Sequence, residues 1–278
     1  PYWVSYPDIV LLADGKPVIV PCDAKQGFKI LPQQLEQHIN QNTKWLMLNS
    51  PSNPTGAVYS YNELKELAEI LLKYPQVFIL SDDIYEKILY DNIDFYTIAT
   101  VEPKLKNRTV TMNGVSKAYC MTGWRLGYCG GPKEIIKAMN KIQSQSTTST
   151  SSISMAAAVE ALDGNQDFIR IHNQSFKKRR DMVVEKLNNI PGISCENPSG
   201  AFYVYPSCKG CIGKKTPKNN TINTDEDFMN YLLDSEGIAG VHGEAFGLSP
   251  YFRISYATDE NTLNEACERI MRACSNLK

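Results

Sequence analysis

The sequence predicts an α/β protein with a mostly parallel, doubly wound sheet and a smaller C-terminal α+β domain. Over the first 165 residues, short apolar runs alternate with longer segments of helical spacing, a pattern typical of a parallel sheet covered by helices. From about Pro191 to Lys278 the composition fits an α+β domain. We therefore expect a large domain over residues 1–165, a bridging helix over 166–190 and a small domain over 191–278.

Each expected strand of the large domain is a short apolar run beside turn-forming residues. The first run follows the turn at Asp14-Gly15, and the second has the continuous apolar character of a buried parallel strand. The expected strands are Lys16–Val20, Lys44–Asn49, Gln76–Leu80, Thr109–Met112 and Trp124–Cys129.

The expected helices of the large domain begin at recognisable residues. Pro32 suits the first turn of one helix, and Ser60 with Glu63 three residues later forms a capping box for the next. The expected helices are Leu31–Asn40, Ser60–Leu72, Lys133–Gln145 and Ser151–Leu162.

A long, charged helical stretch, Asp167–Asn189, leads into the small domain. The polar segment Lys209–Asn220 is interpreted as a mobile surface loop, because it is rich in Lys, Asn and Gly. The small domain is expected to have strands near Ile193–Cys195, Ala201–Tyr205, Ile238–Val241 and Phe252–Tyr256, and helices at Asp225–Leu233 and Glu260–Cys274.

Composition excludes several classes of protein. The formal net charge of −1 provides no basic field for nucleic acid, and no apolar run approaches the ~20 residues of a membrane span. Eight scattered cysteines favour reduced thiols in a cytosolic protein over a disulfide framework. Cys208 and Cys211 have metal-ligand or redox spacing but lack a second pair or a nearby histidine, so we expect no metal site and assign them no role.

The stretch from Asn113 to Tyr128 gives the strongest indication of chemistry. It places Ser116, Lys117 and Arg125 between two apolar runs. A lysine amine can form a Schiff base with an aldehyde, while a serine hydroxyl and an arginine suit a phosphate group. The alternative is that Lys117 is an ordinary loop lysine and Arg125 a cation at the edge of a strand.

Further polar residues follow the neighbouring strands. Asp82 stands at the carboxyl end of a buried strand, Tyr85 comes three residues later, and Asn53 lies in the turn-rich segment after another strand. Asp83 faces the opposite way from Asp82, so only one of the two carboxylates is expected to enter a site. Taken singly, each has a structural alternative, such as a turn at Asn53 or a helix cap at Asp82. Together with Lys117, we expect them to form one pocket at this edge of the sheet.

Four motifs lie along the chain. They are N-P-T-G at Asn53–Gly56, S-D-D-I-Y at Ser81–Tyr85, S-K-A-Y-C-M-T-G-W-R at Ser116–Arg125 and Y-F-R-I-S-Y-A at Tyr251–Ala257. In this order and spacing they resemble the motifs of class I aminotransferases, pyridoxal 5'-phosphate (PLP) enzymes of fold type I. The resemblance covers essentially the whole chain and is strongest with the bacterial aspartate aminotransferase branch.

The resemblance implies a catalytic and cofactor-binding role for several residues. Lys117 resembles the lysine that binds PLP covalently and then moves a proton between the substrate Cα and the cofactor. Asp82 resembles the aspartate beside the pyridine nitrogen, where a carboxylate raises the pKa of that nitrogen and keeps it cationic. Tyr85 and Asn53 resemble the pair that bonds to the phenolic oxygen of the ring.

The remaining roles concern the phosphate and the substrate. Ser116 and Arg125 resemble phosphate ligands, and Arg253 resembles the arginine that holds the substrate α-carboxylate with two parallel bonds. Trp3 resembles the tryptophan that stacks on the pyridine ring and borders the substrate side chain. The expected substrate-binding residues are Trp3, Asn53 and Arg253.

The resemblance implies ping-pong transfer of an amino group between aspartate or glutamate and a 2-oxo acid, in a cytoplasmic homodimer without nucleic-acid or membrane partners. A PLP-dependent C–S lyase of the same fold remains an alternative, because it shares the lysine, the aspartate and both arginines. A catalytically incompetent fragment is another. The chain begins with Pro1 and not Met, so we expect it to lack N-terminal residues of the family's phosphate and partner-subunit sites, and hence to bind PLP weakly.

Overall fold

The computed structural model describes residues 1–278 and divides into two compact units. A four-stranded sheet forms the centre of one of them. The large-sheet unit contains Ile30–Pro51 and Val58–Asn173, and the small-sheet unit contains Pro1–Lys29, Ser52–Ala57 and Gln174–Lys278. The units interleave along the chain, and the predicted domain boundaries near residues 165 and 190 remain a prediction. None of the helices combines the length and the apolar character that crossing a bilayer requires.

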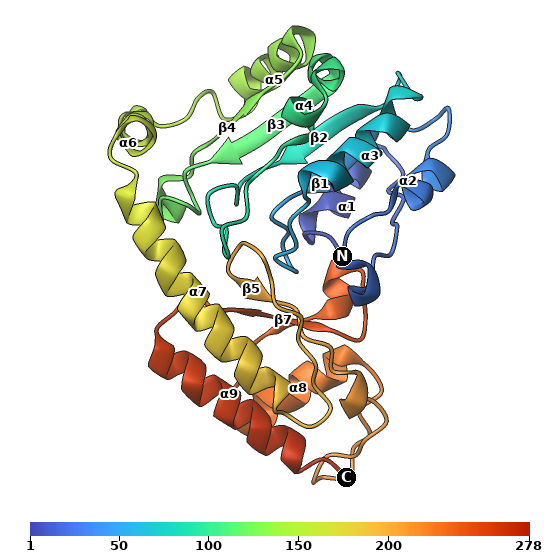
Figure 1. The fold of residues 1–278 in the computed structure, drawn as a ribbon, viewed down its shortest axis with the longest axis vertical. Helices are drawn as coiled ribbons and strands as arrows, with labels where there is room; N and C mark the ends of the chain where they lie inside the picture. Colours follow the sequence, from blue (N-terminus) through green and yellow to red (C-terminus); the bar gives the residue numbers. More distant parts are fainter. The chain divides into compact units, whose positions relative to one another are not determined.

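The sheet of the large-sheet unit has the order β1-β2-β3-β4 (Figure 1). Its strands are β1 (Trp45–Asn49), β2 (Phe78–Asp82), β3 (Thr109–Gly114) and β4 (Gly127–Gly130). The first three are parallel, and β4 runs antiparallel to β3. The prediction of a mostly parallel sheet in an α/β protein is therefore confirmed.

Helices precede, connect and follow the strands of this sheet along the chain. Ser60 caps α3 as predicted, since its hydroxyl accepts from the Glu63 amide and the Glu63 carboxylate accepts from the Ser60 amide at 2.8 Å. Leu67 and Leu71 of α3 are fully buried in a core shared with α2 and α4, and burying one such side chain contributes about 1.5–3 kcal/mol. The helices are α2 (Pro32–His38), α3 (Tyr61–Leu72), α4 (Ile98–Val101), α5 (Lys133–Ser146) and α6 (Ser152–Asp163), with 3-10 turns at Pro103–Arg108 and Thr122–Trp124.

The small-sheet unit has an antiparallel three-stranded sheet of order β5-β7-β6. Its strands are β5 (Tyr203–Val204), β6 (Val241–His242) and β7 (Phe252–Ser255), and its helices are α1 (Ser5–Leu12), α8 (Asp225–Glu236) and α9 (Glu260–Ser275), with 3-10 turns at Ala24–Gln26, Lys209–Cys211 and Gly243–Phe246. The long helix α7 (Asp167–Asn188) continues into this unit from the large-sheet unit.

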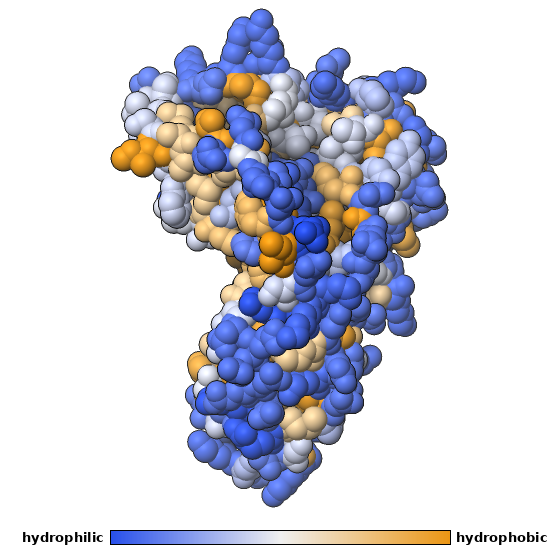
Figure 2. Space-filling model, turned by 60° about the vertical axis from the view of Figure 1, so that its left-hand side comes forward, coloured by the Kyte–Doolittle hydropathy of each residue, from blue (hydrophilic) through white to orange (hydrophobic).

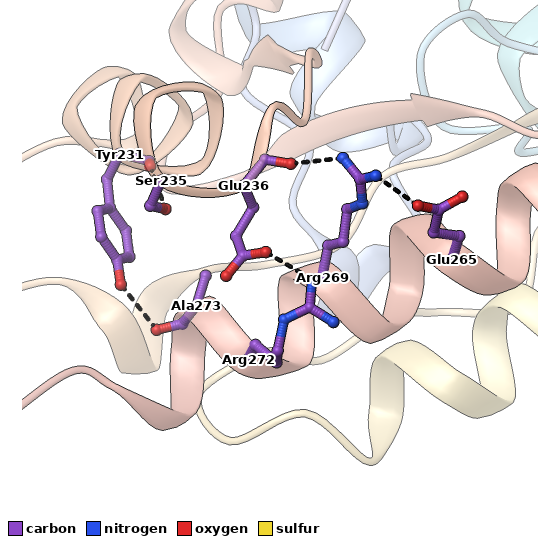
Figure 3. A network of polar contacts seen from close by, with 7 residues as sticks. All are labelled: Tyr231, Ser235, Glu236, Glu265, Arg269, Arg272 and Ala273. Carbon is purple, nitrogen blue, oxygen red and sulfur yellow. Dashed lines mark hydrogen bonds and ion pairs between the residues drawn. The ribbon is translucent and has the colours of Figure 1, made fainter.

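The end of α8 is joined to α9 by a polar network (Figure 3). The Glu236 carbonyl accepts from Arg269 at 2.9 Å and its carboxylate from Arg272 at 2.8 Å. The Tyr231 hydroxyl donates to the Ala273 carbonyl at 3.0 Å. These bonds satisfy polar groups at the ends of both helices, where backbone carbonyls lack partners within the helix.

Two sequence predictions of strands are wrong. Lys16–Val20 forms no strand, and only Ser194 of the expected strand Ile193–Cys195 pairs, in a single bridge with Ser207. The segment Lys209–Asn220 is mostly exposed, as expected, but it is anchored, because Cys211 is fully buried and the Lys215 backbone exchanges two hydrogen bonds with Lys278. In each case the pairing available in three dimensions, and not the local composition, decides the structure.

Gly56 is a position where a side chain would not fit. Its φ is +69°, and a Cβ there would lie 2.5 Å from both the Gly200 carbonyl oxygen and the Pro198 Cβ. A Gly56→Ala variant is expected to lower the free energy of unfolding by about 3 kcal/mol, because left-handed strain and overpacking add. Urea unfolding measures this loss.

Gly213 provides the matched control for that prediction. Its φ is +84°, but a Cβ there would meet no atom within 4 Å. Gly213→Ala is expected to cost only the backbone strain, about 1–2 kcal/mol. Equal losses in the two variants would show that packing against the Pro198 segment contributes nothing.

Candidate active site

Asp82 is the last residue of β2, at the carboxyl edge of the parallel sheet. Its backbone carbonyl accepts from the Asn49 side-chain amide at 2.9 Å and from the Ser50 amide at 3.3 Å. Its carboxylate accepts from the Ile84 amide at 3.3 Å, and the residue is buried. The strand end is thus fixed by its neighbours on β1, so that a buried carboxylate stands where open α/β sheets bind their ligands.

Asp83 has a separate set of partners. Its carboxylate accepts a 2.7 Å hydrogen bond from the Ser81 hydroxyl, which also lies 3.2 Å from the Thr97 hydroxyl. Burial raises the pKa of the Asp83 carboxyl to about 6, even though the Ser81 and Thr97 hydrogen bonds act to lower it. These contacts agree with the prediction that the two carboxylates face opposite ways.

The raised pKa of Asp83 gives a testable pH dependence. The folded protein holds this proton up to about pH 6 while the unfolded chain releases it near pH 3.8, so stability falls as pH rises through this window. Asp83→Asn removes the ionisation while its amide oxygen still accepts from Ser81. We expect it to raise the free energy of unfolding at pH 7.5 by about 2–3 kcal/mol and to change it little at pH 4. Urea unfolding at both pH values, with exposed Asp14→Asn as control, measures this; equal effects at the two pH values would contradict it.

Lys117 follows β3 in a turn that also contains Ser116. Its Nζ lies 5.9 Å from the centroid of the Tyr85 ring, which is itself buried. Gly114 at the end of β3 lets Ile84, in the segment that follows β2, pack closely, because a Cβ at Gly114 would lie 3.1 Å from the Ile84 side chain. The amine and the phenol therefore meet beyond the carboxyl ends of β2 and β3, beside the strand end that carries the Asp82 carboxylate.

Arg125 lies at the same edge of the sheet, but in a turn and not in the predicted strand. The expected strand Trp124–Cys129 is confirmed only in its second half: a 3-10 turn ends at Trp124, Arg125 has a left-handed φ of 52°, and β4 begins at Gly127. Because β4 is antiparallel, its first residues pair with the last residues of β3. Arg125 is exposed there, and its Nη1 donates to the Thr122 carbonyl at 3.0 Å.

In the small-sheet unit, Arg253 on β7 forms a defined cluster. Its Nη1 donates to the Asn53 side-chain oxygen at 2.8 Å. Its guanidinium carbon lies 4.6 Å from the centroid of the Tyr203 ring and 4.9 Å from that of Phe246. Two aromatic faces and one amide therefore hold a planar cation in a fixed orientation, as recognition of a carboxylate by two parallel bonds requires.

Trp3 belongs to the same unit and lies just before α1, where its carbonyl accepts from the Tyr6 amide at 2.9 Å. It is 37% exposed, and its ring meets the edge of Tyr6 with centroids 5.5 Å apart. The preceding residue, Tyr2, donates from its backbone amide to the Phe246 carbonyl at 3.0 Å. Trp3 is thereby tied through the backbone to the residue whose ring faces Arg253.

The structure places the predicted residues in two groups, one in each unit. Asp82, Tyr85, Ser116, Lys117 and Arg125 lie at one edge of the four-stranded sheet, and Trp3, Asn53 and Arg253 lie in the small-sheet unit.

Sequence reasoning missed Asn49, which fixes the Asp82 backbone, and the two aromatic faces on Arg253, Tyr203 and Phe246. A single sequence carries no signal that pairs an aromatic ring with a cation fifty residues away.

The group in the large-sheet unit has the chemistry that PLP needs. A primary amine suits its aldehyde, a buried carboxylate suits its ring nitrogen, a phenol suits its phenolic oxygen, and a hydroxyl with a guanidinium suits its phosphate. Asp82 is the last residue of β2, and the other four residues lie in the segments that follow β2 and β3 or precede β4. The residues present therefore fit the cofactor.

Comparison with known proteins agrees with this geometry. The family model for aminotransferase class I and II matches residues 1–270. An aspartate aminotransferase of Rhizobium meliloti (strain 1021) and an aspartate/prephenate aminotransferase of Cereibacter sphaeroides are each 56% identical over 277 residues, covering 100% of this chain and 68% and 69% of those proteins.

Solved structures give the same result. The crystal structure of the Rhizobium meliloti aspartate aminotransferase matches with a TM-score of 0.98 and 55% identity, over 100% of this chain and 70% of that one. A Thermus thermophilus aspartate aminotransferase double mutant matches with a TM-score of 0.88 and 38% identity, over 98% of this chain and 68% of that one. The protein is therefore a member of the class I and II aminotransferases, which transfer amino groups with the aid of PLP.

Proposed function

We propose that this protein transfers the amino group of aspartate or glutamate to a 2-oxo acid by a ping-pong reaction. The observation that carries the proposal is the position of the Lys117 amine beside Tyr85 at the sheet edge where Asp82 ends its strand. The substrate class follows from the relatives, whose names include aspartate aminotransferase.

The residues of the large-sheet unit act on the cofactor and the transferred proton. Bound PLP supplies an aldehyde carbon that accepts the amino group and a cationic ring that withdraws electrons. Asp82 would keep the ring nitrogen protonated, and Tyr85 would donate to the phenolic oxygen. Ser116 and Arg125 would bind the phosphate. Lys117 would remove the proton from the substrate Cα and deliver it to the former aldehyde carbon of the cofactor.

The residues of the small-sheet unit act on the substrate and the face of the ring. Arg253, oriented by Asn53 and two aromatic rings, binds the α-carboxylate with two charge-assisted bonds. The family resemblance assigns Asn53 to the phenolic oxygen of PLP, and Trp3 to the pyridine ring and the substrate side chain.

The assay that tests the proposal combines the PLP-loaded protein with aspartate and 2-oxoglutarate. Formation of glutamate and oxaloacetate in equal amounts is the expected result. Because one relative is named aspartate/prephenate aminotransferase, prephenate is tested in parallel as amino acceptor. The C–S lyase alternative is not favoured, since these relatives are named as aminotransferases. Pyruvate release from a cysteine conjugate without glutamate formation would contradict the proposal.

The assembly and location of the protein are further parts of the proposal. A homodimer is supported by exposed apolar side chains on α6, including Ile153 and Val159. Figure 2 shows hydrophobic residues gathered at the surface of the molecule. A cytoplasmic location is supported by the free state of all eight cysteines. Sedimentation of the holoenzyme is expected to give twice the subunit mass, and a monomer mass at micromolar concentration would contradict the dimer.

A further inference from the structure

Arg180 on α7 is an arginine buried in the small-sheet unit, with 1% of its side chain exposed. Its Nε donates to the Asp181 carboxylate at 2.8 Å, and its Nη2 lies 2.6 Å from the same oxygen. Its Nη1 donates to the Pro198 carbonyl at 2.9 Å. Burying a guanidinium costs free energy unless the group is paired and hydrogen-bonded, so a buried arginine is expected to have a specific structural or functional role.

The Asp181 bond alone does not explain why this arginine is buried. Asp181 is 46% exposed and also pairs with Lys177 at 2.8 Å, as surface carboxylates commonly do. A lysine could not replace Arg180 fully, because Nε and Nη2 both contact the Asp181 carboxylate while Nη1 remains available for another acceptor. The hydrogen bond from Nη1 to the Pro198 carbonyl is the contact that needs arginine, because only a planar guanidinium can make it while Nε and Nη2 still contact Asp181.

The segment that starts at Pro198 holds the turn that carries Asn53. The Ser199 and Gly200 amides both donate to the Gly56 carbonyl, at 3.1 and 2.9 Å, and the Gly56 amide donates to the Ser52 carbonyl at 2.8 Å. The absence of a Cβ at Gly56 lets the two backbones approach this closely. The Ser52–Ala57 turn is therefore fixed to the Pro198 segment through its backbone.

The same segment also contacts Arg253 directly. Five residues after Pro198, Tyr203 lies with its ring centroid 4.6 Å from the Arg253 guanidinium. Asn53, on the turn held by Gly56, accepts a hydrogen bond from Nη1 of that guanidinium at 2.8 Å. Two of the groups that orient Arg253 are thus attached to one backbone segment, and Arg180 fixes the beginning of that segment.

We infer that Arg180 is a positioning residue for the substrate carboxylate site: through the Pro198 carbonyl it fixes the segment that orients Asn53 and Tyr203 against Arg253. The inference rests on the proposed function, in which Arg253 binds the α-carboxylate. Recognition by two parallel bonds tolerates little displacement, and a misplacement of about 1 Å can cost a hundredfold in rate. Loss of the Arg180 bond is expected to act on substrate binding and not on the large-sheet group around Lys117.

The test compares Arg180→Met, Arg180→Lys and Asp181→Asn holoenzymes. Arg180→Met is expected to raise the KM for aspartate about tenfold, with kcat changed by less than about threefold, because binding to the carboxylate is weakened in ground and transition states alike. Arg180→Lys retains the ion pair but not the fork, and is expected to raise KM about threefold. Asp181→Asn removes the ion pair but leaves the Pro198 bond, and is expected to leave KM unchanged.

A second measurement is independent of turnover. Succinate, a dicarboxylate that cannot react, is titrated into each holoenzyme by calorimetry, and bound PLP per subunit is measured by visible absorbance. We expect succinate affinity to fall in step with KM, and PLP content to stay constant. Unchanged succinate affinity in folded Arg180→Met would overturn the inference. If that variant does not fold, unchanged affinity in Arg180→Lys would overturn it equally.

The design separates this inference from the proposed function. If the wild-type holoenzyme neither forms glutamate nor binds succinate, the proposed function fails, and with it the role given to Arg253. If the wild type does both and the Arg180 variants match it, only the positioning role fails. A loss of the same size in Asp181→Asn would also refute that role, because it would assign the effect to the surface ion pair.

Discussion

A Lys117→Ala holoenzyme is expected to lose transamination almost completely, with kcat lowered by about four orders of magnitude. The amine serves twice in the proposed reaction, as the group that holds the PLP aldehyde and as the acid and base that moves the Cα proton. Proton transfer by a positioned side chain alone contributes about 10²–10⁴ to a rate. The Lys117 Nζ, 5.9 Å from the Tyr85 ring centroid, has no second lysine nearby in the sequence to replace it. Glutamate formation from aspartate and 2-oxoglutarate measures the loss.

The control for this prediction is Lys133→Ala. Lys133 is an exposed lysine at the start of α5, outside the group around Asp82. Its removal is expected to leave kcat within about twofold of the wild type, as surface substitutions generally do. A Lys117→Ala enzyme that keeps more than about a tenth of the wild-type kcat would remove the lysine from the mechanism.

The elements that the sequence predicts best are those with a strong local cause. The helix after Ser60 begins where its capping box places it. The expected runs Lys44–Asn49 and Gln76–Leu80 largely coincide with β1 and with the first part of β2, which extends to Asp82, because continuous apolar runs suit a sheet covered on both faces. The expected strand Lys16–Val20 has an equally apolar composition but no partner to pair with. Strand formation depends on a neighbour, which a single sequence does not show.

The site also contains residues whose positions the sequence predicts and residues whose local structure it does not. The position of Lys117 beyond β3 and of Asp82 at the end of β2 follows from strand direction alone, because parallel strands end at one edge. The location of Arg125 was predicted, but its backbone was not: the left-handed φ of this non-glycine residue depends on the turn that connects β3 to an antiparallel strand.

The contacts that orient Arg253 were beyond sequence reasoning. Asn53 lies two hundred residues earlier in the chain, and the rings of Tyr203 and Phe246 come from two further segments. Only folding brings these segments together, so local pattern and propensity contain no information about them. The motifs nevertheless identify Asn53 and Arg253 as candidates, because family resemblance preserves residues whose contacts are not visible in one sequence.

An Arg253→Met holoenzyme is expected to lower kcat/KM for aspartate by about 10²–10³. Two charge-assisted bonds to the α-carboxylate are lost, each contributing about 1.5–3 kcal/mol, and part of this is offset by water. Arg253→Lys keeps the charge but not the two parallel donors, so its kcat/KM is expected to be at most about tenfold higher than that of Arg253→Met. Steady-state kinetics with aspartate, and calorimetric titration of succinate, measure both variants.

The decisive comparison uses an amine that has no α-carboxylate. If Arg253 acts by binding that group, the wild type and Arg253→Met should react with such an amine at equally low rates, so that the variant loses discrimination and not catalytic capacity. Arg272→Lys is the control, because its ion pair with Glu236 joins α8 to α9 and touches neither Asn53 nor Tyr203. An equal fall in activity toward amines with and without the carboxylate would mean that Arg253 supports the fold of its unit, held between two aromatic rings, and does not contact the substrate.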